Sequence, residues 1–304
     1  MNDKEPEGLF INNMDKREFR PGVSSCGAQD LREEDFENYA KAGIMTMELS
    51  FSWDRYDSIP WKEAYHRAAK NNVELWSFHL PFMPFDVLDI ASLDEDKRRK
   101  TISYQSELIK KAGNIGISAI VIHPSIEPNR ETEREEKIKR AQESLIYLAD
   151  IAEEYGMTIA VENLPRTCLG RDSSDMLKLI CADERLRICF DTNHLLSQPI
   201  KEFIRAVGSK IITTHVSDFD FKNERHWMPG EGKINWPEII DTLREVNYSG
   251  PLMYELELTA PPTINRRVLT YDDFKQNHES LMRGEIPEAI GTPIAEKCIP
   301  WQET

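Results

Sequence analysis

The sequence lacks several features that would place the protein in other structural classes. No stretch of about 18 uninterrupted apolar residues occurs, so we expect no membrane-spanning helix. The opening residues, MNDKEPEGLFINN, lack the basic start and apolar run of a signal peptide, and we therefore expect a cytoplasmic protein. The five cysteines form no CxxC pair, and an odd number fits a reduced compartment better than a disulfide framework. We interpret all five as buried, small apolar residues: Cys26, Cys168, Cys181, Cys189 and Cys298.

Positive charge is also scarce. The chain has 53 Asp and Glu against 38 Lys and Arg, which gives a formal net charge of −15 and a pI near 5.0. Non-specific affinity for nucleic acid comes mostly from Lys and Arg that neutralise phosphates, so this balance argues against a general phosphate-backbone binder. This overall composition is still compatible with a local groove of basic residues.

The pattern of apolar residues predicts one α/β barrel. At about 150 residues per domain, 304 residues would make two domains, but α/β barrels of this length are common as single units. Short apolar runs alternate with amphipathic helical stretches without a linker, which is typical of a parallel sheet. Eight strands are expected, the number in a TIM barrel, at residues 23–28, 45–51, 73–80, 119–122, 158–163, 186–191, 211–216 and 252–258. We predict a single (β/α)8 TIM barrel over residues 20–283, with an N-terminal extension (1–19) and a C-terminal tail (284–304).

Two connections carry further expectations. Residues 217–234 form a long loop that contains proline and glycine, and loops of this length tend to be functional. Asn235 precedes Trp236 and Pro237, which predicts an N-cap with proline in the first turn of a helix over residues 236–246. Prolines in the tail argue against a long helix there.

Polar residues follow most of the predicted strands at their C-terminal ends, where a TIM barrel builds its active site. These residues are Glu48, His79, His123, Glu162, Asp191, His215 and Glu255. Charges gathered in a low-dielectric cavity cost several kcal/mol each unless a metal or partner groups offset them. The convergence of so many at one mouth therefore favours a functional site.

Carboxylates and imidazoles together suit a divalent ion such as Mn, Mg, Co or Zn, and no thiolate is needed. We expect the ligands to come from the last four strands, leaving positions open for substrate oxygens: Glu162, Asp191, His215 and Glu255. Glu257 competes with Glu255 for the last place. Alternation along a strand would point both to the same face, so spacing alone does not decide between them.

Five motifs, taken in order, carry a family resemblance: ENLPRTCLG, FDTNH, HVSDF, RHWMPGEGKI and YSGPLMYELE. Each is weak alone, but one per strand end makes a specific set. The chain resembles the xylose isomerase-like TIM-barrel superfamily of sugar isomerases, sugar epimerases and endonuclease IV over residues 20–283. The resemblance implies one divalent metal ion (Mn, Co, Mg or Zn) on Glu162, Asp191, His215 and Glu255. It thereby favours Glu255 over Glu257.

The resemblance also implies an enzyme, an isomerase or epimerase of a small-molecule sugar, either a ketose or a related keto-polyol. Glu162 and Glu255 would be catalytic, removing and returning a proton on opposite faces of the substrate through a metal-stabilised enediolate. The side chains implied to contact substrate are His79, His123, His194 and Arg225. Arg225 has an alternative interpretation as a surface loop residue.

Endonuclease IV offers a competing interpretation, a multinuclear zinc phosphodiesterase. Eight of its nine zinc ligands have counterparts here: His79, His123, Glu162, Asp191, His194, His215, His226 and Glu255. The departure is Glu224, where the nuclease pattern has Asp. The acidic balance and the lack of a basic, aromatic-interleaved run argue against nucleic acid as a partner. A dehydratase or a non-catalytic sugar binder also stays open, because fold does not fix function.

The sequence says less about the substrate and the assembly. Trp53, Trp76, Phe82 and Trp227 lie near strand ends and either enclose a sugar or pack in an ordinary way. No Gly-rich phosphate cradle follows the last two strands, which favours an unphosphorylated substrate. Dimers and tetramers are common in the family, so a homo-oligomer is possible, with the tail after Glu285 serving as an interface. The sugar, the stereocentre and the metal are left open.

Overall fold

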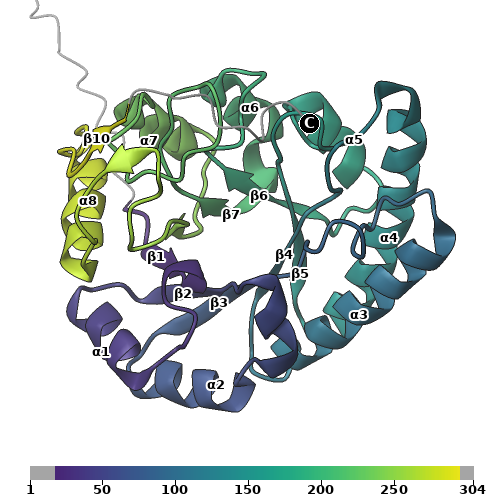
Figure 1. Cartoon of the computed structure of the whole chain (residues 1–304), viewed down its shortest axis with the longest axis horizontal. Helices are drawn as coiled ribbons and strands as arrows, with labels where there is room; N and C mark the ends of the chain where they lie inside the picture. Colours follow the sequence, from purple (N-terminus) through teal and green to yellow (C-terminus); the bar gives the residue numbers. More distant parts are fainter. Residues whose placement is uncertain (1–17, 295–304) are drawn as a thin grey trace, which may run out of the picture.

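Eight parallel strands form a barrel surrounded by helices in the computed structural model, which describes residues 18–294 (Figure 1). Neighbouring strands follow the order β7-β6-β5-β4-β3-β2-β1-β8. The remaining seam is bridged where Val216 pairs in parallel with Tyr254 and the Val216 N–H donates to the Met253 carbonyl at 2.7 Å. The predicted (β/α)8 TIM barrel is therefore confirmed. Its division from an extension and a tail stays a prediction, since residues 1–17 and 295–304 lie outside the described residues.

The strands lie where the apolar runs predicted them, with two corrections. They are β1 (Pro21–Ser24), β2 (Thr46–Leu49), β3 (Glu74–His79), β4 (Ala119–Ile122), β5 (Thr158–Glu162), β6 (Arg187–Asp191), β7 (Ile211–His215) and β8 (Leu252–Tyr254). β1 ends at Ser24 instead of residue 28, because the chain turns there into a short 3-10 helix (Ser25–Gly27). β8 ends at Tyr254 instead of residue 258, because the chain then leaves the barrel.

Helices follow the strands and cover the outside of the barrel (Figure 1). They are α1 (Glu33–Lys41), α2 (Trp61–Lys70), α3 (Glu95–Gly113), α4 (Arg134–Glu154), α5 (Ser173–Ile180), α6 (Ile200–Val207), α7 (Trp236–Glu245) and α8 (Tyr271–Arg283). Further 3-10 turns are Trp53–Ser58, Glu131–Glu133 and Gly208–Lys210. Two short strands, β9 (Ile264–Asn265) and β10 (Thr292–Pro293), pair antiparallel beside the barrel. Asn235 precedes α7 as predicted, but its side chain makes no capping hydrogen bond.

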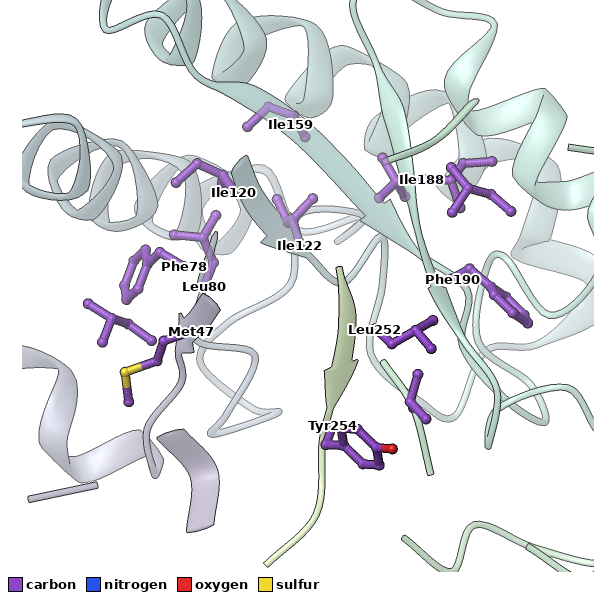
Figure 2. Packing of buried hydrophobic residues seen from close by; sticks show 14 of the residues in the cluster. Met47, Phe78, Leu80, Ile120, Ile122, Ile159, Ile188, Phe190, Leu252 and Tyr254 are labelled. Atoms are coloured by element: carbon purple, nitrogen blue, oxygen red, sulfur yellow. The ribbon is translucent and has the colours of Figure 1, made fainter. Parts of the chain in front are cut away.

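The apolar core lies between the strands and the helices, because alternate strand residues point outward. Ile120 and Ile122 of β4 belong to the large core cluster, as do Ile188 and Phe190 of β6 (Figure 2). The residues between them form a separate small cluster inside the barrel: Val121, Ala160 and Cys189. The same alternation turns the last residues of β5 and β6 inward, and a register shift between β6 and β7 places His215 beside Asp191 at the same end of the barrel.

The expectation that all five cysteines are buried is wrong. Cys168 and Cys189 are buried, Cys26 is half-buried, and Cys298 lies outside the described residues. Cys181 is exposed, because it caps the C-terminal end of α5, where its thiol donates to the Lys178 carbonyl at 3.0 Å. Within residues 18–294, no helix combines the length and apolarity needed to cross a bilayer.

We predict that His278 makes folding stability depend on pH. His278 of α8 is buried and pairs through Nε2 with the Phe19 carbonyl at 2.9 Å. Burial lowers its pKa from 6.5 to about 4, although the Phe19 carbonyl opposes this shift. Between these values the unfolded chain binds a proton that the folded chain does not, so stability falls as the pH falls. The loss reaches about 3 kcal/mol below pH 4.

Chemical denaturation of the wild type and H278Q from pH 8 to pH 4 checks this prediction. Gln retains a donor for the Phe19 carbonyl without the titration, so the variant should lose less stability on acidification. H66Q, a change at an exposed position on α2, controls for the removal of a histidine as such. Parallel stability curves for the wild type and H278Q would contradict the role given to His278.

Candidate active site

Four predicted metal ligands converge at the C-terminal mouth of the barrel. Glu162, Asp191 and His215 end β5, β6 and β7, and Glu255 directly follows β8. One ligand atom from each lies within 4.8 Å of the others. His215 Nδ1 is 3.3 Å from an oxygen of Glu162, 3.3 Å from one of Glu255 and 3.8 Å from one of Asp191. Glu257 is exposed and outside this group, because the strand ends before the alternation reaches it.

Two buried atoms of this group have no hydrogen-bond partner among the described residues, Asp191 Oδ2 and His215 Nδ1. The other oxygen of Asp191 accepts from the backbone N–H groups of Asn193 at 2.6 Å and His194 at 3.1 Å. Oδ2 is thereby left facing His215. Unpaired buried polar atoms cost free energy unless something binds them. Three carboxylates and one imidazole around them fit a divalent cation.

The carboxyl groups of this cluster have shifted pKa values, because they are buried close to one another and to histidines. Burial raises the pKa of Asp191 to about 7, with His194 opposing the shift and the charge of Glu255 adding to it. Burial also raises the pKa of Glu162, but the positive charges of His215 and His123 hold it well below its usual value. A bound divalent ion would stabilise all three carboxylates in their charged form.

Glu48, a strand-end residue without a predicted role, orients His215. Its Oε1 lies 3.0 Å from His215 Nε2, and its Oε2 accepts from the Ser77 hydroxyl at 2.8 Å. Both Glu48 and His215 are fully buried. When Nε2 carries the proton and donates to Glu48, Nδ1 is the unprotonated nitrogen and points to the other three ligands. Such carboxylate–histidine pairs fix the tautomer of metal-binding histidines.

His79 and His123 both lie against Glu162. Their Nε2 atoms are 3.1 Å and 3.3 Å from Glu162 Oε2, and His79 Nδ1 is 2.8 Å from the Leu80 carbonyl. The ring of His123 stacks on Phe82 at a centroid distance of 4.1 Å. Burial lowers the pKa of His79, but the hydrogen bond and charge of Glu162 reverse this and raise it. The two rings therefore hold Glu162 from the cavity side.

A second group of ligand atoms lies beside the first. His194, Glu224 and His226 each offer one ligand atom within 4.8 Å of the others, and His79, His123 and Glu162 form a further such group. His194 Nδ1 is 3.2 Å from Glu162 Oε1. The group that contains His194 therefore adjoins the four-ligand group that contains Glu162. The residues that the nuclease interpretation requires thus lie near one another.

A cavity of about 150 Å³ opens onto these groups. Its charged and polar lining includes His79, His123, Glu127, Glu162, Arg166, His194, Glu224, His226 and Glu255, and its apolar wall includes Phe82, Phe85, Ile126, Leu164 and Pro165. Phe82 lines the cavity as the sequence suggested, whereas Trp53, Trp76 and Trp227 do not. Trp53 is exposed, and the Trp227 indole donates to the Thr263 hydroxyl. Nothing in the spacing singled out Phe85 or Glu127.

Of the two arginines near the mouth, the structure brings Arg166 and not Arg225 to the cavity wall. Arg225 is buried, its guanidinium bonds to Asp220 at 2.8 and 3.0 Å, and it lies over the ring of Trp227. Its backbone N–H donates to Asn193 Oδ1 at 2.9 Å. Sequence reasoning missed Arg166 although it stands in ENLPRTCLG, because that motif was analysed for its glutamate.

Comparisons with known proteins give one family. A family model described as a xylose isomerase-like TIM barrel matches residues 36–271. The uncharacterized protein MJ1311 of Methanocaldococcus jannaschii is 29% identical over 181 residues, 57% of this chain and 62% of that protein. The D-psicose 3-epimerase of Ruminiclostridium cellulolyticum is 23% identical over 258 residues, 81% of this chain and 85% of that enzyme. The crystal structure of a D-tagatose 3-epimerase-like protein superposes with a TM-score of 0.69 at 25% identity, covering 78% and 90% of the two chains.

We predict that Glu48→Gln weakens metal binding, although residue 48 is not one of the four proposed ligands. The change removes the charge that favours a proton on His215 Nε2, and the affinity should fall about 10- to 100-fold. Titration of metal-free protein with Mn²⁺ or Zn²⁺, followed by calorimetry, measures the effect. E257Q, at the exposed glutamate after β8, serves as the control. Equal affinities in E48Q and the wild type would show that the pair does not orient His215.

Proposed function

Because the chain belongs to the xylose isomerase-like TIM-barrel family, as its motifs predicted, we propose that it is a divalent-metal-dependent isomerase or epimerase. Its substrate class is a small, unphosphorylated ketose or related keto-polyol. The observation that carries the proposal is the buried group of Glu162, Asp191, His215 and Glu255 at the barrel mouth. The epimerase names of similar proteins support the enzyme class.

The two glutamates are suited to move a proton. Both line the cavity, and they come from different strand ends, Glu162 from the end of β5 and Glu255 from the position after β8. Removal of a proton next to a carbonyl leaves negative charge on oxygen, which must be stabilised as it develops. A divalent ion held by the four ligands would supply that positive charge. Glu162 and Glu255 would then take the proton from one face of the substrate and return it to the other.

The neighbouring histidines complete the arrangement. His79 and His123 fix one oxygen of Glu162, so its carboxylate presents a constant orientation to the substrate. His194, whose Nδ1 lies 2.9 Å from the Asn163 carbonyl, lines the cavity with its ring and would bind a substrate hydroxyl. Phe82 and Phe85 contribute apolar surface to the cavity wall. Arg225 does not line the cavity, so it would support the surrounding loop through Asp220 and Trp227 and would not contact the substrate.

The charge of the cavity supports an unphosphorylated substrate. Among its lining residues stand four glutamates, and Arg166 is the one arginine or lysine there. Arg166 is already paired with Glu127 and Glu224. A phosphate would add negative charge beside Glu127 and Glu224, where the guanidinium of Arg166 is already paired with both carboxylates. The same balance, with a net charge of −15, disfavours the phosphodiesterase alternative.

We predict that Glu162→Gln abolishes turnover while the fold is retained. The variant should lose at least about 100-fold in the rate of deuterium incorporation from D₂O into a ketose, because the proton acceptor is gone. A panel of ketoses with saturating Mn²⁺ and proton NMR measures this rate. Metal content determined in parallel separates a lost base from a lost ligand, and E257Q is the matched control. A metal-loaded E162Q with wild-type exchange would remove Glu162 from proton transfer, and binding without any exchange in the wild type would indicate a sugar binder.

Phosphorylated ketoses should be poor substrates. We expect kcat/KM for a ketose phosphate to be at least about 100-fold below that of the same free ketose, because of repulsion from the cavity glutamates. Steady-state assays on matched pairs of sugars test this expectation at two ionic strengths. A preference for the phosphate ester would contradict the proposed substrate class.

A further inference from the structure

Three loops are joined at the cavity mouth by one guanidinium. Arg166, between β5 and α5, places its Nε 3.1 Å from both carboxylate oxygens of Glu127, which lies between β4 and α4. Its Nη1 forms an ion pair with Glu224 Oε1 at 2.5 Å and donates to Asn223 Oδ1 at 2.9 Å. Glu224 and Asn223 belong to the long loop between β7 and α7. Arg166 is thus held from two sides by carboxylates.

The charge of Arg166 is permanent at this place. Burial lowers its pKa, but the hydrogen bond to Glu127 and the charges of Glu224 and Glu127 more than reverse the effect. Its backbone adopts a left-handed conformation with φ of 51°, which turns the side chain back over the cavity. The guanidinium therefore acts as a fixed positive charge at the mouth.

Glu224 is shared between this charge and a set of metal-type ligands. Its Oε1 faces Arg166, and its Oε2 faces His194 Nε2 at 3.9 Å. His226 completes the group of three ligand atoms. Two imidazoles and one carboxylate are a ligand set that zinc and similar ions accept. A cation bound there would lie across a single carboxylate from the guanidinium, and the two positive charges would repel each other.

We propose that Arg166 is a specificity-determining residue that keeps the site to one metal ion, by standing as the counter-charge of Glu224 where a second ion would otherwise bind. The proposal rests on the proposed function for its first metal, on Glu162, Asp191, His215 and Glu255. With a positive charge at this position, the additional ligand-type side chains His194, Glu224 and His226 would be present without forming a polynuclear metal centre. Pairs of metal ions about 4 Å apart suit phosphoester displacement, whereas one ion suffices for proton transfer next to a carbonyl.

Zinc stoichiometry tests the proposal independently of activity. Metal-free wild type, R166M and R166K are titrated with Zn²⁺ by calorimetry, and the bound zinc is counted by plasma emission spectrometry after dialysis. The wild type and R166K should bind one ion per chain, because both retain the positive charge. R166M should bind a second ion at least about 100-fold more tightly than the wild type does. The double variant R166M/H226Q should return to one.

Several outcomes overturn the proposal. One ion in folded R166M, or two in the wild type, would show that Arg166 does not set the number. A wild type that binds no zinc would contradict the proposed metal centre as well. If R166M fails to fold, R166Q, which also removes the positive charge, replaces it with the same expected zinc count, and one ion in folded R166Q would contradict the proposal. H226Q should bind zinc as the wild type does, and a lost ion would show that His226 already binds metal.

Discussion

The structure depends on how buried negative charge is stabilised at the mouth of the barrel. One imidazole, that of His215, lies next to four carboxyl groups in a region with almost no access to water: those of Glu48, Glu162, Asp191 and Glu255. Such charges would separate or take up protons if nothing opposed them. The histidines beside Glu162 oppose its charge, and a metal ion between the four ligands, as we propose, would oppose the charge of the others. The strands are rigid enough to hold the ligands together because the apolar core outside the barrel fixes each of them.

The loops around this centre need a frame of their own, which the β7–α7 loop provides. Asp218, at its start, accepts from the Gly230 and Ile234 N–H groups and from the Trp236 indole. A side chain at Gly232 would lie 2.2 Å from Asp218 Oδ1, so the turn requires glycine. Farther along, Glu231 and Arg266 form a fully buried ion pair at 2.9 Å, which ties this loop to the segment after β8. His226 and Glu255, one on each segment, are positioned by the same frame.

The sequence was sufficient for the barrel and for the inward residues at its strand ends. Strand positions follow from apolar runs, and parity then fixes which side chain points inward, as for Glu162 and Asp191. His215 reaches the same group through a register shift between β6 and β7, which the apolar pattern does not show. It was insufficient where the backbone leaves regular structure. Periodicity did not decide between Glu255 and Glu257, because β8 ends before either residue; the family resemblance favoured Glu255, which lines the cavity. The sequence placed Arg225 at the substrate and did not identify Arg166, because short-range spacing does not encode which way an irregular loop turns.

We attribute the specificity of the site to the loops around the strand-end ligands. The ligand side chains at the strand ends are held in place by the barrel, whereas the charges around them come from loops. Here Glu127, Arg166 and Glu224 come from three different loops and meet beside the ligand group. One guanidinium between two carboxylates places a positive charge next to the additional ligands. The preference for an uncharged sugar and the limit of one metal ion, both of which we propose, would depend on the same three side chains.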